Sequence, residues 1–315
     1  MKELLVSLIV PVYNTVQYLD ELYQSLVAQS ISDFEAIFID DGSTDGSSEK
    51  LLELTNQDNR FSVYHQKNSG QGVARNLGFS KSTGRYVMFV DSDDVLHDRC
   101  LEYCLASVQK SGADFFQFRF RKGVTPSDIT ASHYQSASVH CISIREAIFT
   151  AWPISPCSLI RRDLLERSGI KFPSYKYEDN VEIPRIISFA QKVVLSDAEL
   201  YYYRTNEFST VHNPKNLPDL LLAADGLLVL AEEIPLFYSE FVYRSYGVLR
   251  RFLEVGGVAE KRDEVSRRLL QEPYTSNPYV QIPKRIRESY ESSLSWKLSA
   301  PIRWIGDLCD KVRHS

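Results

Sequence analysis

The sequence lacks the long apolar runs that mark membrane-spanning proteins and the cysteine patterns that mark zinc-binding proteins. No apolar run approaches the roughly 20 residues that a membrane-spanning helix needs. The apolar segment 1–11 is too short for a signal peptide and ends in Pro11. The 5 cysteines do not form the paired spacings of a zinc site. We therefore expect reduced thiols in a cytoplasmic protein that does not span a membrane.

An excess of positive charge is also missing. Lys and Arg number 36 and Asp and Glu number 41, which gives a net charge of −5. Nucleic-acid-binding domains normally carry a basic patch or stripe, so we expect no nucleic-acid partner. Gly-x-Gly-x-x-Gly does not follow the first predicted strand, and Gly-x-x-x-x-Gly-Lys-Ser/Thr is absent. Dinucleotide oxidoreductases and P-loop NTPases are therefore disfavoured.

What the sequence does contain, in its first third, is an alternation of strand and helix patterns. Apolar runs typical of buried strands alternate with apolar residues at helical spacing. The predicted strands are 4–12, 34–39, 61–65 and 86–90, and the predicted helices are 18–29, 47–54, 73–80 and 99–110. This order predicts an α/β fold with a mostly parallel sheet and right-handed crossovers.

The pattern changes along the rest of the chain. The next predicted strands are 114–121, 158–160, 192–195 and 200–204, and 123–138 is a polar excursion. From Leu217 onward, apolar residues recur at helical spacing over 217–233 and 237–253, and 260–270 is amphipathic. The C-terminal third is therefore predicted to be mainly helical, and its apolar faces suit a domain core or a homo-oligomer interface equally well.

The stretch from Tyr86 to Asp94 is the one around which the chain is organised. An apolar strand runs directly into three carboxylates, those of Asp91, Asp93 and Asp94. Open α/β sheets bind ligands at the carboxyl ends of their strands. Asp91 and Asp93 are two residues apart, so both can reach one hard cation, Mg²⁺ or Mn²⁺, that also holds phosphate oxygens. A solvated acidic turn explains this cluster equally well when it is taken alone.

Two further loops are predicted at the same edge of the sheet, at Pro11–Asn14 and at Asp40–Gly46. Asp40 or Asp41 could accept the ring N–H of a pyrimidine base, and Tyr13 could stack on that base. Arg75, on the helix behind the Gly-containing loop 68–72, is a candidate for contact with a diphosphate or a sugar. The alternative for Arg75 is an exposed position on that helix.

Four motifs, in this order, resemble glycosyltransferase family 2. They are Ser7–Asn14, Asp40–Asp45, Gly70–Asn76 and the Asp-x-Asp-type run Asp91–Asp94, and the resemblance covers roughly residues 4–212. It implies the family's GT-A fold and an inverting, metal-dependent transfer of a sugar from a UDP-sugar to an acceptor hydroxyl. It also implies a catalytic domain at 1–212, with a nucleotide-binding half at 1–112 and an acceptor half at 113–212, followed by a helical region at 213–315.

The resemblance also assigns roles on the donor side. The family positions that match Pro11, Tyr13 and Asp41 hold the uracil, and those that match Asn68 and Arg75 contact the nucleotide or the sugar of the donor. The match to Asp91 touches the ribose or the sugar, with Ser92 beside it in the same run. The match to Asp93 ligates the cation, which we expect to be Mn²⁺ or Mg²⁺.

Two more assignments lie later in the chain. Glu178-Asp179 resembles the acidic pair whose aspartate is the catalytic base in inverting members, and a helix start keeps such a carboxylate ionised. Asp179 could instead only cap the helix that follows it. His212 matches a position that supplies a histidine to the metal or the diphosphate in related bacterial enzymes, and an ordinary surface histidine is the alternative.

The C-terminal segment 296–313 places Trp296 and several aliphatic residues among basic residues. Such an amphipathic helix can lie in a membrane interface, and packing back onto the protein explains the same pattern. The first alternative would bring the enzyme to the inner face of the cell membrane. Family members of this size often act there on lipid-linked oligosaccharide acceptors in bacterial surface polysaccharide synthesis.

Two other functions stay open. A sugar-1-phosphate nucleotidyltransferase uses similar metal and nucleotide chemistry, but usually carries a Gly-rich, basic loop after its first strand, which Pro11–Asn14 is not. A non-catalytic carbohydrate-binding protein on a degenerate transferase scaffold would have no need of a general base such as Asp179.

Overall fold

The computed structural model describes residues 5–123, 133–205 and 214–254, and residues 261, 264–265, 268–269, 271, 273–274 and 276–281 of the segment that follows. The chain forms two compact units. The first comprises Met1–Ile142, Ile154–Tyr175 and Phe189–Ser209, and the second comprises Ser143–Pro153, Lys176–Ser188 and Thr210–Ser315. The chain therefore passes between the units more than once, and the domain division at residue 212 stays a prediction.

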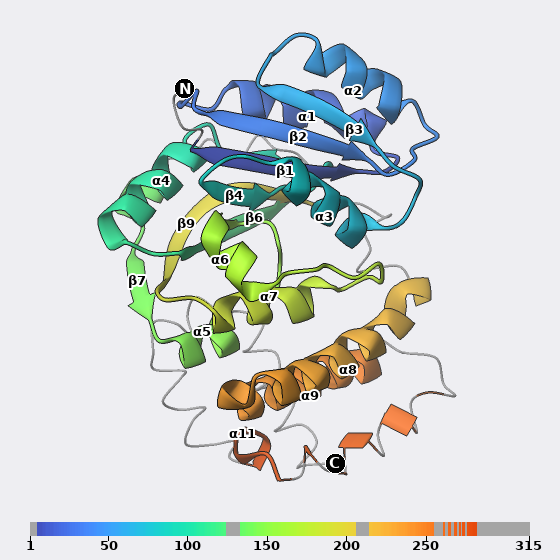
Figure 1. Cartoon of the computed structure of the whole chain (residues 1–315), viewed down its shortest axis with the longest axis vertical. Helices are drawn as coiled ribbons and strands as arrows, with labels where there is room; N and C mark the ends of the chain where they lie inside the picture. The colour runs from blue at the N-terminus through green and yellow to red at the C-terminus, as the bar shows by residue number, and fades with distance from the viewer. Residues whose placement is uncertain are drawn as a thin grey trace. The chain divides into compact units, whose positions relative to one another are not determined.

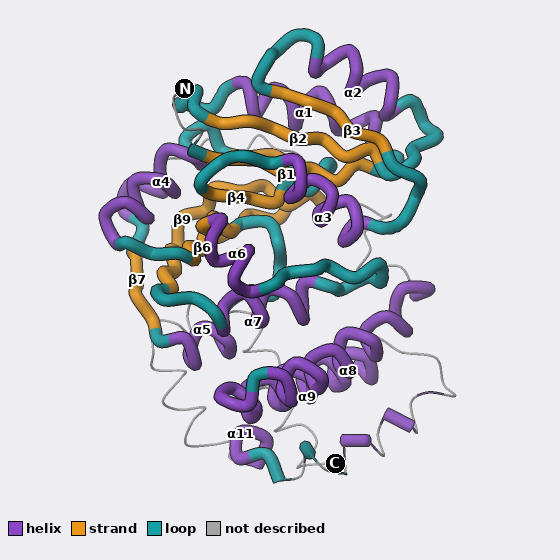
Figure 2. Tube along the Cα trace, viewed as in Figure 1, coloured by secondary structure: helices purple, strands orange, loops and turns teal. Residues whose placement is uncertain are grey.

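The first unit is built on one mixed sheet (Figures 1 and 2). Its strands are β1 (Val6–Val12), β2 (Phe34–Asp40), β3 (Phe61–His65), β4 (Tyr86–Phe89), β5 (Val95–Leu96), β6 (Phe115–Gly123), β7 (Val139–Ile142), β8 (Ser158–Arg161) and β9 (Val193–Arg204). They lie in the order β3-β2-β1-β4-β8-β6-β9-β5, and β7 pairs with β9. The first four are parallel neighbours, whereas β8 is antiparallel to both β4 and β6. The predicted α/β fold with a mostly parallel N-terminal sheet is confirmed.

Helices cover both faces of this sheet. They are α1 (Val16–Val27), α2 (Ser47–Thr55), α3 (Gln71–Lys81), α4 (Cys100–Ser111) and α6 (Arg162–Ser168), with a 3-10 turn at His133–Ser136. On β2, Phe38 packs into the core with α1, α2 and α4, whereas Ile37 and Ile39 pack with Ala74 of α3. Successive residues of a strand point to opposite faces, so α3 covers the face opposite to that of α1.

The second half of the sheet differs from the sequence prediction in two ways. One continuous strand, β9, replaces the two strands predicted at 192–195 and 200–204. Ser196 and Glu199, which lie between them, keep their pairing with β7 and β6 respectively. β7 follows the polar excursion directly and is not among the predicted strands. Its four residues alternate between exposed and partly buried positions and contain no apolar run that would mark a strand.

The second unit is helical. It contains α5 (Ile144–Thr150), α7 (Asp179–Ser188), α8 (Leu217–Glu233), α9 (Tyr238–Glu254) and α11 (Pro278–Gln281), with 3-10 turns at Pro214–Asn216 and Pro235–Phe237. α8 and α9 run side by side (Figure 1). The predicted helical character of the C-terminal region is confirmed, and none of the helices described is long and apolar enough to span a bilayer. His212 and segment 296–313 lie outside the described residues.

The short helices of this unit depend on the long ones. Arg244 of α9 is partly buried and donates to the backbone oxygens of Ile148 and Ala151 at the end of α5, and loss of hydration lowers the pKa of Arg244 to about 10. Arg185 of α7 pairs with Glu233 of α8 at 2.7 Å. These contacts satisfy orphan carbonyl groups and charges that the short helices cannot satisfy alone.

Candidate functional site

The carboxyl ends of β1, β2 and β4 meet at one edge of the first unit's sheet. β1 pairs with β2 through its last residue, Val12, whereas its ladder with β4 stops after the bond from the Val90 N–H to the Ile9 oxygen at 3.0 Å. Pro11, the next residue of β1 that faces β4, has no N–H with which to continue the ladder. The two strands therefore part at this edge, which is where open α/β sheets place ligands.

The loops after β1 and β2 are locked to each other by side-chain hydrogen bonds. The Asn14 side chain accepts the Thr44 N–H at 2.8 Å, and Asp45 accepts the Val16 N–H at 3.0 Å. Asn14 has a φ of +52°, a left-handed conformation that Asn tolerates better than most residues. Tyr13 projects from this fixed loop with 48% of its surface exposed, so its ring is accessible for stacking.

Asp41 holds the loop that carries Asn68. Its carboxylate accepts the N–H groups of Ser69 at 2.7 Å and Gly70 at 2.9 Å, and the Gln66 amide at 2.8 Å. A carboxylate offers about four acceptor positions, so these three bonds leave little capacity for a base. Asn68 itself is exposed. The contact of Asp41 with a uracil stays a prediction, while its role in ordering residues 66–70 is visible.

Asp40 has a different role from its neighbour. It accepts the Ser43 N–H at 3.0 Å and lies 3.1 Å from His65 Nδ1. Burial alone would raise the pKa of Asp40, but the hydrogen bonds from Ser43 and His65 outweigh burial and lower the pKa. Asp40 is thus an ionised residue that fixes the turn after β2.

Arg75 is buried against the acidic run Asp91–Asp94. The Arg75 side chain is 2% exposed, and its Nη2 lies 3.1 Å from Asp91 Oδ1. The Gln71 amide donates to the same oxygen at 2.8 Å, so the first turns of α3 hold Asp91 with two donors. The alternative of an exposed helix residue at position 75 is wrong, because the Arg75 side chain points into the sheet edge and lies over the Phe172 ring at 5.4 Å.

The other members of the acidic run are also fixed. The Ser92 hydroxyl accepts the Thr15 hydroxyl at 2.9 Å. Asp94 is buried and accepts the Arg204 N–H at 2.8 Å. Burial, followed by repulsion from Asp93 and Asp91, raises the pKa of Asp94 well above its ordinary value. Asp94 therefore holds the turn, and its raised pKa reflects the negative charges of Asp93 and Asp91 beside it.

The carboxylate oxygens of Asp91 and Asp93 are of the type that fits a divalent cation. Mg²⁺ and Mn²⁺ prefer carboxylate oxygens, and Asp93 is only partly buried. Within the described ranges, no group of three or more His, Cys, Asp or Glu side chains is arranged to hold a metal on its own. Phosphate oxygens and water would have to complete the coordination shell, as is usual for Mg²⁺.

Glu178 and Asp179 belong to the second unit. α7 begins at Asp179, so the pair lies at a helix start, as the sequence predicts. Glu178 is buried, and its backbone oxygen accepts the N–H of Glu182 at 3.0 Å. The residue before the pair, Tyr177, has a φ of +64°, which turns the chain sharply into the helix. A carboxylate in the first turn is stabilised in its charged form by the helix dipole.

Sequence reasoning assigned no role on the donor side to two residues that the structure places beside the acidic run, Gln71 and Arg204. Gln71 lies inside the third motif, so its position could have been noticed. Arg204 lies more than 100 residues beyond the run that it contacts, and no local pattern marks it.

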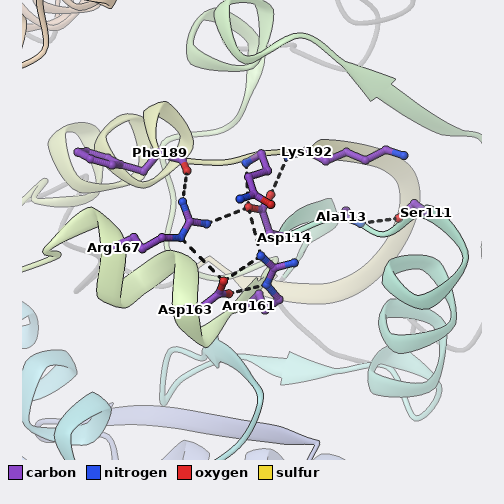
Figure 3. Close-up of polar contacts among 9 residues, drawn as sticks. Ser111, Ala113, Asp114, Arg161, Asp163, Arg167, Phe189 and Lys192 are labelled. Atoms are coloured by element: carbon purple, nitrogen blue, oxygen red, sulfur yellow. Dashed lines mark hydrogen bonds and ion pairs between the residues drawn. The ribbon is translucent and has the colours of Figure 1, made fainter.

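A second polar cluster of the first unit is centred on Asp114 (Figure 3). Asp114 is 1% exposed and accepts the N–H groups of Gln191 and Lys192, each at 2.8 Å, and Arg167 Nη2 at 3.2 Å. Phe115, the residue after Asp114, pairs with Ile160 of β8, and Ile160 pairs with Val87 near the start of β4. Asp114 therefore lies at the edge of the sheet opposite to the acidic run, which follows the end of β4. This carboxylate ties β6 to the start of β9, and its donors already satisfy it.

Comparisons with known proteins agree with the geometry. The Glycosyl transferase family 2 model matches residues 7–169. Glycosyltransferase GlyG of Streptococcus pneumoniae is 30% identical over 245 residues, which cover 73% of this chain and 79% of GlyG. The putative glycosyltransferase EpsH of Bacillus subtilis is 31% identical over 220 residues, which cover 65% of this chain and 62% of EpsH.

Solved structures show the same fold. Staphylococcus aureus TarS in complex with UDP-GlcNAc superposes with a TM-score of 0.60 at 23% identity, over 83% of each chain. The mannosyltransferase PcManGT of Pyrobaculum calidifontis, in complex with GDP-Man and Mn²⁺, gives a TM-score of 0.56 at 16% identity, over 86% of this chain and 82% of PcManGT. With the GT-A fold and the family match in agreement, the chain belongs to glycosyl transferase family 2.

Proposed function

We propose that this glycosyltransferase moves a sugar from a UDP-sugar to an acceptor hydroxyl with inversion, in the synthesis of a bacterial surface polysaccharide. One observation carries the donor side of the proposal. Asp41, Arg75 and the run Asp91–Asp94 are all fixed at one edge of one sheet, with Tyr13 exposed beside them. This arrangement supports the proposal that a base, a diphosphate and a cation bind along this edge, with Tyr13 stacking on the base and Asp41 ordering the loop beside it.

The relatives suggest the donor to test first. TarS is described as a poly(ribitol-phosphate) β-N-acetylglucosaminyltransferase, is 28% identical over 63% of this chain, and has been solved with UDP-GlcNAc. We therefore propose a UDP-sugar as donor and take UDP-GlcNAc as the first candidate. A carbohydrate or a lipid-linked oligosaccharide is the proposed acceptor. A cytoplasmic location, with residues 296–313 at the membrane surface or packed on the protein, also stays a prediction.

Asp93 would hold the cation, with His212 as a further proposed ligand. When bound, Mn²⁺ or Mg²⁺ supplies charge neutralisation for the diphosphate leaving group. Arg75 lies on the same edge, where it pairs with Asp91, and is proposed to contact the diphosphate or the sugar of the donor. Asp91 and Ser92 would contact the ribose or the sugar.

Asp179 is proposed as the general base. It would take the proton of the acceptor hydroxyl while that oxygen bonds to the anomeric carbon and the bond from this carbon to the diphosphate oxygen breaks. Displacement on an α-linked donor gives a β-linked product. The support for this role is the resemblance of the Glu178-Asp179 pair and the position of Asp179 in the first turn of α7.

Calorimetric titration of UDP with and without Mn²⁺ tests the donor site. We expect Mn²⁺-dependent binding by the wild type, loss of that dependence in Asp93→Ala, and unchanged binding in Asp163→Ala, whose half-exposed carboxylate lies in the Asp114 cluster. Failure of the wild type to bind UDP under either condition would refute the uridine assignment.

Hydrolysis of UDP-GlcNAc tests the base, with water in place of the acceptor. Asp179→Asn should lower its rate by about two to four orders of magnitude without weakening UDP binding. Equal rates in the variant and the wild type would point to a protein that binds carbohydrate without using a base.

A further inference from the structure

The segment Phe172–Ser174 belongs to the first unit and is held against α3 by the side chain of Asn76. Asn76 Nδ2 donates to the Phe172 backbone oxygen at 2.7 Å, and Asn76 Oδ1 accepts the Phe172 N–H at 3.0 Å. One amide thus satisfies both backbone groups of Phe172, which lies outside the strands of the sheet. These two bonds fix the point at which the Phe172 side chain leaves the backbone.

Two glycines at the start of α3 let this segment approach the helix backbone. A Cβ at Gly72 would lie 2.0 Å from the Pro173 oxygen, and a Cβ at Gly70 would lie 2.7 Å from the Ser174 oxygen. Neither position can carry a side chain unless the segment moves away. The close approach brings the Phe172 ring within reach of Arg75, on the next turn of the helix.

The Phe172 ring lies beneath the Arg75 guanidinium. Arg75 Cζ is 5.4 Å from the ring centroid, and both side chains are 2% exposed. The ring is itself fixed, since it packs edge-on against Phe89 of β4 with the ring centroids 5.2 Å apart. The negative face of an aromatic ring attracts a cation, and the attraction is stronger where water is excluded. Phe172 therefore holds the Arg75 guanidinium in one place.

Contact with a ring does not use the N–H groups of an arginine, which lie in the plane of the guanidinium and suit carboxylate and phosphate oxygens. The Arg75 Nη2 atom reaches Asp91 Oδ1 at 3.1 Å. We propose that Phe172 is a positioning residue, which fixes Arg75 for contact with the part of the donor beyond the nucleoside monophosphate. This inference rests on the proposed role of Arg75 in donor binding and extends it to a residue that does not touch the donor.

Loss of the ring should weaken donor binding through Arg75 alone. Without the ring the arginine can take several side-chain orientations, and the donor would have to order it on binding, which lowers affinity. The loops on the uracil side keep their own contacts, because Asp41 still accepts the Ser69 N–H and Asn14 still accepts the Thr44 N–H. A ligand that does not reach Arg75 should therefore bind as before.

Calorimetric titration of UMP, UDP and UDP-GlcNAc, each with Mn²⁺, tests the proposal. Phe172→Leu removes the ring and keeps an apolar side chain, and Arg75→Ala shows which of the three ligands reach the arginine. Phe34→Leu is the matched control, because Phe34 is also buried and lies under an arginine, Arg60, at 4.5 Å. It stands at the start of β2, at the opposite end of this strand from the loop at Asp40–Gly46. Thermal unfolding shows that the proteins compared are folded.

We expect Phe172→Leu to weaken the binding of the same ligands that Arg75→Ala affects, by about three- to tenfold, with UMP affinity within about twofold of the wild type. In the Arg75→Ala background, Phe172→Leu should cost less than about twofold, because the ring acts through the arginine. Phe34→Leu should lower the unfolding temperature and leave all three affinities unchanged.

Equal losses for UMP and UDP-GlcNAc in Phe172→Leu would overturn the proposal. So would its full effect again in the Arg75→Ala background, or an unchanged affinity for the ligands that Arg75→Ala affects. If Phe172→Leu fails to fold, Asn76→Ala keeps the ring but removes both bonds that hold its backbone, and the absence of the same selective loss there would be equally decisive. A wild type that binds none of the three ligands, or Arg75→Ala with wild-type affinity for all of them, would instead refute the proposed donor site itself.

Discussion

Arg204 donates its Nε–H to the backbone oxygen of Asp93 at 2.8 Å. Its own N–H donates to Asp94, and its guanidinium pairs with Glu21 of α1 and lies over the Tyr18 ring at 4.8 Å. The last residue of β9 thus connects α1 to the run that follows β4. The shape of the proposed cation site depends on this contact as well as on the carboxylates.

Replacement of Arg204 by Ala should weaken Mn²⁺-dependent UDP binding about tenfold and lower the free energy of unfolding by about 2 kcal/mol, because charge-assisted hydrogen bonds are lost at a buried position. The backbone bond to Asp94 remains, so the effect on binding should be smaller than that of Asp93→Ala. Titration and urea unfolding measure the two quantities. Arg99→Ala, at a half-exposed guanidinium, is the control. Undiminished affinity in Arg204→Ala would contradict this role.

Acid should remove the stability that Asp40 contributes. The pKa of Asp40 is lowered in the folded protein, so its contribution is complete above the ordinary Asp pKa of about 3.9 and disappears as the pH falls through the lower folded value. The difference in the free energy of unfolding between the wild type and Asp40→Asn should therefore be present at about pH 5 and shrink below about pH 4. Urea unfolding across this pH range measures it. A difference that stays constant at about pH 3 would show that these hydrogen bonds do not depend on the charge.

Two glycines with nearly the same positive φ allow the effect of backbone strain to be separated from the effect of a steric contact. Gly42 has a φ of +72°, and a Cβ there would lie 2.9 Å from the Asn68 nitrogen, whereas Gly112 has a φ of +71° and open space around it. Gly112→Ala should cost only the left-handed penalty of about 1 kcal/mol. Gly42→Ala should cost more and should also weaken UDP binding, since it displaces the loop that Asp41 holds. Equal effects of the two variants in unfolding and titration would show that this contact has no influence.

The Asp114 cluster should influence stability and leave catalysis unchanged. Asp114→Asn leaves Arg167 and two backbone N–H groups facing a neutral amide, so we expect a loss of about 3 kcal/mol in the free energy of unfolding. Asp163→Ala should cost less than about 1 kcal/mol, because its carboxylate is half exposed. The kcat of UDP-GlcNAc hydrolysis per folded molecule should match the wild type in both variants. A lower kcat in either variant would show that the Asp114 cluster influences the reaction as well as stability.

The sequence predicted the features that depend on neighbouring residues. The alternating order of the first four strands, the loops that follow β1, β2 and β4, and the start of α7 all leave local marks, namely apolar periodicity and polar residues at strand ends. For the same reason, the α/β fold and the donor-side loops follow from the pattern of residues alone.

Features that depend on distant residues could not be predicted in this way. β8 pairs in the antiparallel direction between β4 and β6, and nothing in Ser158–Arg161 specifies its neighbours. The hydrogen bonds of Asn76 to Phe172 and of Arg204 to Asp93 span 96 and 111 positions. The sequence pattern leaves the Asp41 carboxylate available to a ligand. In the structure this carboxylate already accepts three hydrogen bonds from residues 66–70, a loop that comes later in the chain.

The dependence of α7 on α8 has a consequence for synthesis on the ribosome. The Lys176 N–H donates to Asp219, and Arg185 pairs with Glu233, so both ends of the acidic segment rely on residues that are translated later. Chains grow at about 5–20 residues per second, and units fold as they emerge. A nascent chain that has just released α7 can therefore pack this helix against α5 but lacks α8 for a few seconds. Codon usage or chaperone binding between residues 188 and 233 would act on that interval.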